Sequence, residues 1–163
     1  MVFKPVTEEN FTELVEIYSQ GIATNIATFQ NDLPIWKDWD IGHLNFCRIS
    51  LYENNKMIGW TALSPVSSRC VYSGVAEVSV YVATDARGKG VGQILLNELI
   101  RQSEANGIWT LQSGIFAENK PSIKLHENCG FRIVGYREKI GKKNGVWKDS
   151  ILMERRSQLI GIN

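Results

Sequence analysis

The sequence has few cysteines, and their arrangement is uninformative. The three cysteines, Cys47, Cys70 and Cys129, are odd in number and form neither a CxxC pair nor a metal-ligand spacing. None shows a sign of activation, so we expect all three to be packing residues in a reducing compartment. The sequence therefore predicts neither a disulfide framework nor a metal site.

An excess of one charge and a long hydrophobic run are also lacking. Lys and Arg number 18 against 17 Asp and Glu, a net charge of +1 that creates no overall field favouring nucleic acid or an anionic membrane. The N-terminus MVFKPVTEEN lacks the apolar core of a signal peptide, and no stretch approaches the roughly 18 uncharged apolar residues of a membrane span. We expect a cytoplasmic protein that binds neither nucleic acid nor membrane, in which any anionic ligand is held locally.

What the chain does have is the composition of one folded unit. Hydrophobic residues make up 44% and charged residues 21% of its 163 residues, far from the polar bias of disordered chains. This length suffices to bury a core without metals or cross-links. There is no internal repeat and no low-complexity segment. We expect a single domain over residues 1–163.

The first half of the chain predicts a strand, a helix and a hairpin. A short strand over residues 2–6 precedes a helix that Thr7 caps. The segment 24–44 is less regular, with a short helix opening near Pro34. FCRISLYE and KMIGWTALSPV predict two strands joined by a tight turn at Asn54-Asn55. The first helix has one apolar stripe at helical spacing, formed by Phe11, Leu14, Val15, Tyr18 and Ile22.

The second half predicts a strand, a helix and a further strand. VAEVSVYVA and GIWTLQSGIFA are strongly β-prone, and a helix that starts near Gly90 lies between them. A short helix over NKPSIKLHENCGF follows, with Asn119 near its cap. FRIVGYREKI and VWKDSILMER then predict two antiparallel strands. The residues expected to share the buried face of the longer helix are Val91, Ile94, Leu95 and Leu99.

The stretch DARGKGVG, residues 85–92, joins the strand to the longer helix. A glycine-rich turn at this place aims unpaired backbone N–H groups and the helix dipole at one point, which suits an anion. A Walker A loop would need glycine at 83 and Ser or Thr at 90, where the chain has Ala83 and Gly90. A dinucleotide fingerprint would need glycine in place of Gln93. Both motifs fail, and a tight turn with solvated basic residues remains the plain alternative.

The spacing of Arg87, Gly90 and Gly92 resembles (Q/R)xxGx(G/A), the acyl-coenzyme A pyrophosphate loop of the GNAT acetyltransferase superfamily. The segments EVSVYVATDARGKGVGQILLNELI and NKPSIKLHENCGF resemble the core of that superfamily in order and spacing. Within it, the chain is similar to the phosphinothricin N-acetyltransferases over most of its length. That similarity includes the glutamate of AEVSVYV, the helix SIKLHENCGF, GVWKD near the end, and ATF at 27–29.

The resemblance implies a fold, an activity and an assembly. The fold is α/β (α+β), with a central mixed, mostly antiparallel sheet whose middle strands splay and which helices flank. The activity is transfer of an acetyl group from acetyl-CoA to the amine of a small amino-acid-like compound, such as phosphinothricin or methionine sulfoximine. The amine attacks directly in a ternary complex, without a covalent enzyme intermediate. The assembly implied by this branch is a homodimer.

The resemblance also implies how acetyl-CoA is bound. Main-chain groups of the strand bind the pantetheine arm and the thioester oxygen, and amides of the glycine turn hold the diphosphate beside two basic side chains. Two residues of the short helix match positions that contact the coenzyme arm, although both are also ordinary capping residues. The implied contacts are Val80, Tyr81, Val82, Arg87, Gly88, Lys89, Gly90, Val91, Gly92, Asn119 and Ser122.

Two residues are candidates for the proton transfers. The reaction needs an uncharged amine, yet the pKa of an aliphatic ammonium is about 10. Glu77 is the candidate base, because its apolar neighbours Ala76 and Val78 would desolvate its carboxylate and raise its pKa. A glutamate on the solvent face of the strand is the alternative. His126 occupies the position where family members often have a tyrosine that protonates the departing thiolate, and a packed, hydrogen-bonded histidine is the alternative.

The acceptor-binding residues are candidates on loops. Arg69, with Tyr72 beside it, is expected to bind a carboxylate, since a bidentate arginine is its natural partner. A surface loop arginine is the alternative. Large aromatic side chains are more often plain core, but four of them are candidates for the pocket wall. These are Phe29, favoured by the ATF match, and Trp36, Trp60 and Trp147.

Two other functions stay open at this stage. One is acetylation of a different amine, such as an aminoglycoside, a polyamine or a protein N-terminus. The other is a module that binds acyl-CoA without catalysis.

Overall fold

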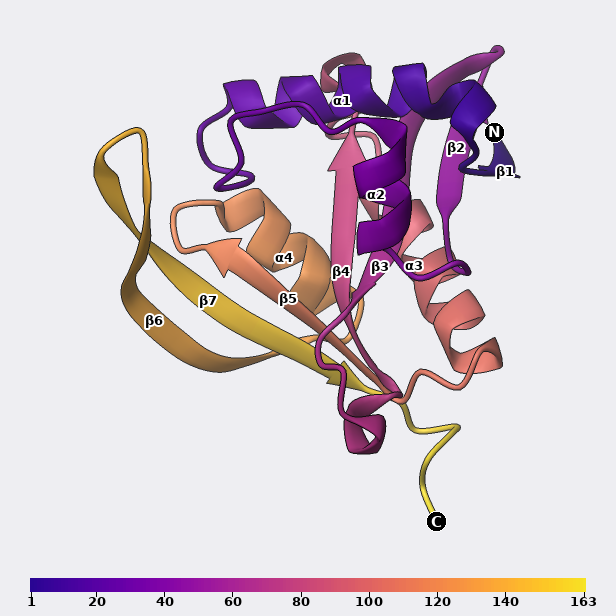
Figure 1. The fold of residues 1–163 in the computed structure, drawn as a ribbon, viewed down its shortest axis with the longest axis vertical. Coiled ribbons are helices and arrows are strands. Elements are labelled where there is room, and N and C mark those ends of the chain that lie inside the picture. The colour runs from indigo at the N-terminus through magenta and orange to yellow at the C-terminus, as the bar shows by residue number, and fades with distance from the viewer.

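The computed structural model describes all 163 residues and has a seven-stranded sheet at its centre. Helices lie on both faces of this sheet (Figure 1). The strands are β1 (Val2–Pro5), β2 (Ile49–Glu53), β3 (Lys56–Pro65), β4 (Val75–Val82), β5 (Thr110–Phe116), β6 (Arg132–Lys143) and β7 (Val146–Arg156). The helices are α1 (Phe11–Ala23), α2 (Trp36–Gly42), α3 (Val91–Ala105) and α4 (Lys120–Asn128).

The sheet has the strand order β1-β2-β3-β4-β5-β7-β6, and only the β4–β5 pair is parallel. The predicted mixed, mostly antiparallel sheet is therefore confirmed. The β2–β3 hairpin turns at Asn54 and Asn55, whose φ angles of 51° and 60° lie in the left-handed region that asparagine tolerates. The strand and helix order follows the expectation from the sequence throughout.

The two central strands separate part-way along their length. β4 and β5 pair over three residues only, with Val75–Glu77 of β4 alongside Thr110–Gln112 of β5. Beyond these three residue pairs, β4 continues to Val82 paired with β3 alone, and β5 continues to Phe116 paired with β7 alone. Two strand edges are thus left facing one another without ladder hydrogen bonds, and Figure 1 shows β4 and β5 diverging there.

Helix α3 packs against β3 and β4 through a stripe that lacks one predicted residue and contains two that were not predicted. Val91, Leu95 and Leu99 are buried as expected, but Ile94 is 37% exposed. Leu96 and Ile100 complete the buried stripe instead, because they lie on the side of the helix turned away from Ile94 at 3.6 residues per turn.

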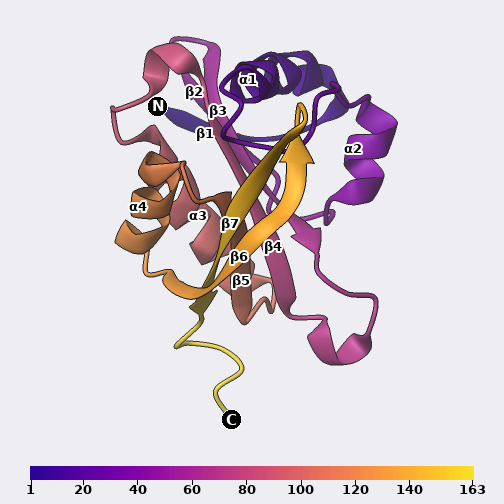
Figure 2. The same cartoon turned by 90° about the vertical axis from the view of Figure 1, so that its left-hand side faces the viewer.

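Helix α1 packs against the same two strands from the other face, so the sheet is covered on both sides (Figure 2). Its buried residues include Phe11, Leu14 and Ile17. Cys47 and Cys129 are buried and Cys70 is exposed, so the expectation of a packing role is wrong for Cys70. No helix is both long enough and apolar enough to cross a membrane.

Candidate active site

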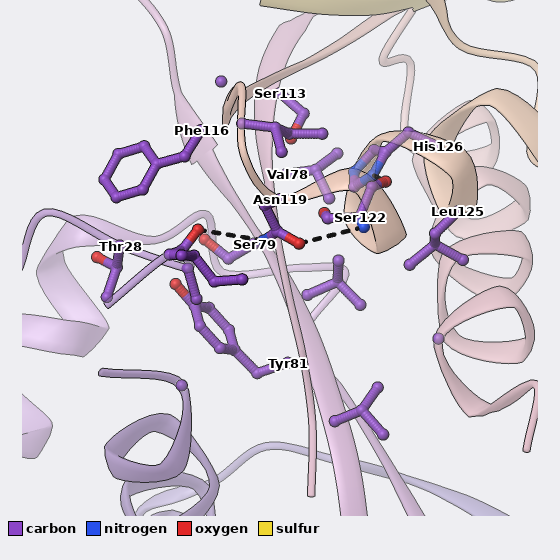
Figure 3. Close-up of a pocket in the computed structure, with 18 of the residues that line it drawn as sticks. Thr28, Val78, Ser79, Tyr81, Ser113, Phe116, Asn119, Ser122, Leu125 and His126 are labelled. Atoms are coloured by element: carbon purple, nitrogen blue, oxygen red, sulfur yellow. Dashed lines mark hydrogen bonds between the residues drawn. The ribbon is translucent and has the colours of Figure 1, made fainter. Parts of the chain in front are cut away.

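The gap between β4 and β5 opens into a cavity of about 1310 Å³. It extends from the turn before α3, past α4, to the loop between α1 and α2 and to strands β6 and β7. Figure 3 shows part of it, where Asn119, just before α4, and Ser122 and Leu125 of α4 line the cavity together with Val78 and Ser79 of β4. The cavity thus reaches from the glycine turn to the face of the sheet that bears Glu77, Gln112 and Phe116.

The glycine turn has the geometry of an anion cradle. Gly88 and Gly90 have φ angles of +74° and +80°, which L side chains rarely adopt, while nothing within 4 Å would obstruct a Cβ atom at either position. Backbone conformation therefore requires glycine there. At Gly92 the requirement is space, because a Cβ atom would lie 2.9 Å from Leu125 of α4. The first-turn N–H groups of α3 have no carbonyl of their own helix to bond and are free for a ligand.

The two basic residues of the turn differ in position. Arg87 lines the cavity, and its Nε donates to Val82 O at 3.2 Å, which keeps the guanidinium beside the turn. Lys89 is exposed and does not line the cavity. Of the predicted positive charges at the mouth, only Arg87 is in place.

The predicted stretch of β4 lies along the gap. Val80, Tyr81 and Val82 line the cavity and have no β5 partner, so one hydrogen-bonding edge of their backbone is free. The ring of Tyr81 stacks on Trp60, with 5.0 Å between centroids, and meets Tyr18 edge-on at 4.9 Å. Burial raises the pKa of the Tyr81 hydroxyl. This side chain is part of the core, which leaves the main chain to contact a ligand.

Asn119 and Ser122 hold the start of α4 against the cavity. Ser122 N donates to Asn119 Oδ1 at 3.3 Å, and Asn119 Nδ2 donates to Ile26 O at 3.2 Å. Both residues line the cavity, and Figure 3 shows them at the start of α4, on its cavity side. The capping function is therefore present, and it ties α4 to the loop after α1.

His126 is buried and neutral in this arrangement. Its Nδ1 donates to Ser122 O at 2.7 Å, because a carbonyl oxygen can only accept. Burial lowers the pKa of His126, and the bond to Ser122 opposes this to a lesser degree. Nε2 then carries a lone pair and has no protein partner. A neutral imidazole in this tautomer accepts a proton at Nε2 and cannot donate one, so the predicted acid role does not fit the geometry.

Glu77 lies at the last residue pair before the strands part. Its carboxylate is exposed and accepts a hydrogen bond from Gln112 Nε2 at 3.1 Å. The expected desolvation by Ala76 and Val78 is wrong, because alternation along the strand puts those two side chains on the opposite face. Glu77 lines the cavity from the face on which α1 packs.

The aromatic candidates divide into two groups. Phe29 lines the cavity, meets Phe116 edge-on at 4.5 Å and covers Gly141, where a Cβ atom would lie 2.9 Å from the ring. Trp60 is buried and lines the cavity as well. Trp36 packs on Phe11 and Trp39, and Trp147 is exposed beneath Lys142. Neither Trp36 nor Trp147 reaches the cavity, so both expectations are wrong.

Arg69 and Tyr72 lie together but away from the cavity. They belong to an exposed turn after β3 that contains a short 3₁₀ helix, and the Arg69 guanidinium lies 5.5 Å from the centre of the Tyr72 ring. Neither residue lines the cavity within this chain. The structure thus keeps the predicted pair together and leaves it outside the lining of the cavity.

Comparison with known proteins decides the family. Residues 11–131 match the model of the Acetyltransferase (GNAT) family. The chain belongs to the GNAT acetyltransferases. The phosphinothricin N-acetyltransferase of Alcaligenes faecalis is 30% identical over 92% of this chain and 79% of its own.

Solved GNAT structures show the same fold. A phosphinothricin acetyltransferase from Sinorhizobium meliloti, in complex with acetyl-CoA, is 27% identical, with a TM-score of 0.84 over 95% of this chain and 87% of its own. A ribosomal-protein-alanine N-acetyltransferase from Brucella melitensis is 27% identical, with a TM-score of 0.87 over 96% of this chain and 100% of its own. The predicted family, fold class and enzyme class are therefore confirmed.

The cavity of this GNAT chain fits acetyl-CoA on structural grounds. The left-handed glycines and the free amides before α3 suit a diphosphate, and the unpaired edge of β4 suits an extended arm that carries amide groups. No group of three or more His, Cys, Asp or Glu residues is placed to hold a metal ion.

Several cavity residues of this GNAT chain were not predicted from the sequence, among them His43 and Arg137. His43 follows α2, stacks on Trp39 at 4.2 Å and donates from Nδ1 to Trp39 O at 2.7 Å. Burial lowers its pKa, so its Nε2 also carries a lone pair. The i, i+4 spacing of Trp39 and His43 was the available signal. Arg137 lines the cavity from β6, and nothing in its local pattern distinguishes it from the charged residues around it.

Proposed function

We propose that this GNAT protein transfers the acetyl group of acetyl-CoA to the primary amine of a small amino-acid-like acceptor. One observation carries the proposal: a single cavity connects the glycine turn at Gly88–Gly92 with the open face that bears Glu77. A donor bound at the turn and an acceptor entering over that face would meet between β4 and β5.

Donor binding follows from the free backbone groups. The diphosphate would lie on the amides of the turn with Arg87 beside it, and the pantetheine arm would follow the unpaired edge of Val80–Val82. Asn119, just before α4, and Ser122 of α4 line the same cavity as this edge. The thioester would then stand near the point where β4 and β5 part.

The chemical step is direct attack in a ternary complex. Glu77 accepts one proton from the acceptor ammonium, directly or through a water molecule, and the neutral amine attacks the acetyl carbonyl. The C–N bond forms and the C–S bond breaks, and the attacking nitrogen loses its second proton, which passes through solvent to the departing thiolate of coenzyme A. No cysteine lines the cavity, which supports a route without an acyl-enzyme intermediate.

The proposed acceptor class has a rival. The relatives from Alcaligenes and Sinorhizobium are named for phosphinothricin, whereas the similar Brucella structure is named for ribosomal-protein alanine. We favour the small acceptor because Phe29 and the loop around it close over the cavity against Phe116 and Gly141, which narrows the space for a peptide.

A substrate panel tests the function. Purified protein is given acetyl-CoA with phosphinothricin, methionine sulfoximine, peptides with free N-termini, polyamines or an aminoglycoside, and free thiol is measured. We expect release with the amino-acid-like amines above the rate without acceptor. Turnover of peptides alone overturns the small-acceptor assignment, and acetyl-CoA binding without turnover of any amine identifies a binding module.

The proposal also includes an oligomeric state, a homodimer, and a location, the cytoplasm. Several apolar side chains are exposed on the outer strand β6, including Ile133, Val134 and Tyr136, and they support the homodimer that the branch implies. Light scattering on the purified protein measures its oligomeric state, and a monomer at micromolar concentration would contradict the proposed homodimer.

The proposed cytoplasmic location is tested by cell fractionation.

A further inference from the structure

Arg137 is a cavity residue that the proposed mechanism does not use. It lies on β6 opposite Ser150 of β7, and Ser150 in turn lies opposite Phe116 of β5. Residues directly opposite one another on antiparallel strands point to the same face of a sheet. Arg137, Ser150 and Phe116 therefore form a row on one face, and all three line the cavity.

This row lies on the same face as Glu77. Gln112 donates to Glu77, which places both side chains on one side of the sheet. Phe116 is four residues after Gln112 on the same strand, so it points the same way. Glu77 and Arg137 thus project over one continuous surface from opposite sides of the β4–β5 gap.

The register also sets Arg137 level with the proposed thioester site. Glu77 is paired with Gln112 in a parallel ladder, so Val80 and Tyr81 stand at about the height of Ile115 and Phe116. Arg137 belongs to the Phe116 row, two strand spacings away, which is about 10 Å. An arginine side chain extending toward the gap covers much of this distance and leaves room for a small molecule.

The charge of Arg137 has no partner in the protein. Of the chain's eight arginines, Arg137 alone has neither a hydrogen bond, an ion pair nor an aromatic ring beneath it. The other cationic residues that line the cavity are Arg87, in the glycine turn, and Lys124, on α4. Arg137 is therefore the free cation on the acceptor side.

Carboxylates of other elements line the same cavity. Asp38 of α2 and Asp32 of the preceding loop line it together with Glu77. A molecule with an ammonium group at one end and an oxyanion at the other would match three carboxylates and one unpaired arginine. An amino acid is such a molecule.

We propose that Arg137 binds the α-carboxylate of the acceptor amino acid and so directs its amine toward Glu77 and the thioester. The inference rests on the proposed function and assigns Arg137 the task that the sequence analysis gave to Arg69. The planar guanidinium forms two parallel hydrogen bonds with a carboxylate, a geometry that lysine cannot reproduce. Arg137 is thus a determinant of acceptor specificity that does not take part in proton transfer.

The test compares Arg137→Gln and Arg137→Lys with Arg132→Gln. Arg132 is on the same strand, is paired with Glu154 and does not line the cavity, which makes it the matched control. Loss of a charged hydrogen bond of about 1.5 to 3 kcal/mol predicts a rise in acceptor KM of about 10- to 100-fold in Arg137→Gln. We expect a smaller rise in Arg137→Lys, unchanged KM for acetyl-CoA, and wild-type kinetics in Arg132→Gln.

The choice of acceptor shows which group is bound. With methionine sulfone, whose only anion is its carboxylate, Arg137→Gln should raise KM, whereas with the carboxamide of the same compound wild type and variant should have equal KM. A structural defect would affect acid and amide alike. Phosphinothricin carries a second oxyanion, so a KM effect confined to phosphinothricin would overturn the carboxylate assignment.

The remaining outcomes are equally decisive. Unchanged KM in Arg137→Gln, or a rise in Arg69→Gln instead, overturns this inference and leaves the proposed function standing, provided that the wild-type protein acetylates amino acids. A wild-type protein that acetylates no amino acid overturns the proposed function and this inference with it.

Discussion

At the scale of single residues, hydrogen bonds to the backbone fix the state of both histidines in the cavity. His43 and His126, the only histidines in the chain, each donate from Nδ1 to the carbonyl four residues earlier, both at 2.7 Å. Burial lowers the pKa of each. Both rings are therefore neutral and carry a lone pair at Nε2. A nitrogen in this state accepts a proton, so neither histidine is suited to protonate a leaving group.

Glu77→Gln separates catalysis from binding. The side chain is exposed and the amide is of the same size, so fold and acetyl-CoA affinity should be retained. Loss of a general base predicts a fall in kcat of about 10²- to 10⁴-fold, measured by thiol release. Glu53→Gln, at the end of β2 and outside the cavity, serves as the control and should keep the wild-type rate. An unchanged rate in Glu77→Gln removes Glu77 from the mechanism.

His126 should make stability depend on pH. Its pKa in the folded protein is lower than in the unfolded chain, where it is about 6.5. Between these two values the unfolded state binds more protons, so the free energy of unfolding falls as pH falls below about 6.5. Urea unfolding at pH 7.5 and 5.5 measures this loss, and His126→Leu should show a smaller loss than wild type. Equal losses in the two proteins would contradict the prediction.

At the scale of elements, the turn before α3 combines two demands on glycine. Gly88 and Gly90 need the left-handed conformation, and Gly92 needs the close approach of α4. The first demand brings backbone amides to face the cavity, and the second sets the distance between α3 and α4. One short segment therefore determines both the conformation of the glycine turn and the distance between α3 and α4.

Gly90→Ala tests the turn against a matched position. Gly90 and Gly107 both have φ of +80°, an added methyl group would meet nothing within 4 Å at either, and they lie at opposite ends of α3. A left-handed alanine costs about 1 to 2 kcal/mol, so both variants should lose similar stability. Only Gly90→Ala should weaken acetyl-CoA binding, as measured by calorimetry. Equal affinities in the two variants would contradict an anion site at the turn.

The β6–β7 hairpin fixes the loop above the cavity. Lys143 is 2% exposed, and its Nζ donates to Gln30 O and Asn31 Oδ1, both at 2.5 Å. Phe29 of the same loop covers Gly141 of the same hairpin. A buried lysine held only by neutral oxygen atoms joins two segments more than 100 residues apart, so this part of the cavity wall depends on the hairpin as much as on the loop.

At the scale of the whole molecule, the sheet consists of two parts joined by one short parallel ladder. β1 to β4 form one part and β5, β7 and β6 form the other, with three residue pairs between them. Figure 1 shows the two parts diverging from this junction. A ligand bound in the gap contacts both parts and substitutes for the ladder that is absent there.

Acetyl-CoA should therefore stabilise the whole fold. At a concentration 100 times its Kd, a ligand that binds only the folded state adds about 2.7 kcal/mol to the free energy of unfolding. Thermal unfolding with and without acetyl-CoA should show a clear rise in Tm. The rise should be smaller in Gly90→Ala and unchanged in Gly107→Ala. A Tm that does not respond to acetyl-CoA would contradict donor binding in the gap.

The sequence predicted those parts of the fold and site that depend on neighbours along the chain. The order of strands and helices, the hairpin at Asn54-Asn55 and the glycine turn all follow from spacing within short segments. It failed where the answer depended on contacts between distant segments. Alternation allowed Glu77 to lie on either face of the sheet, and only the packing of α1 and α3 shows that it lies on the α1 face, where its side chain stays exposed.

The sequence by itself determined the order of elements and the glycine turn before α3, because helix and strand periods and glycine conformations are local properties. Tertiary structure alone decided that Arg137 and His43 line the cavity while Arg69 and Trp147 do not. The physical reason is that strand pairing brings residues of β4, β5, β7 and β6 into one row, and no pattern along a single segment encodes that register.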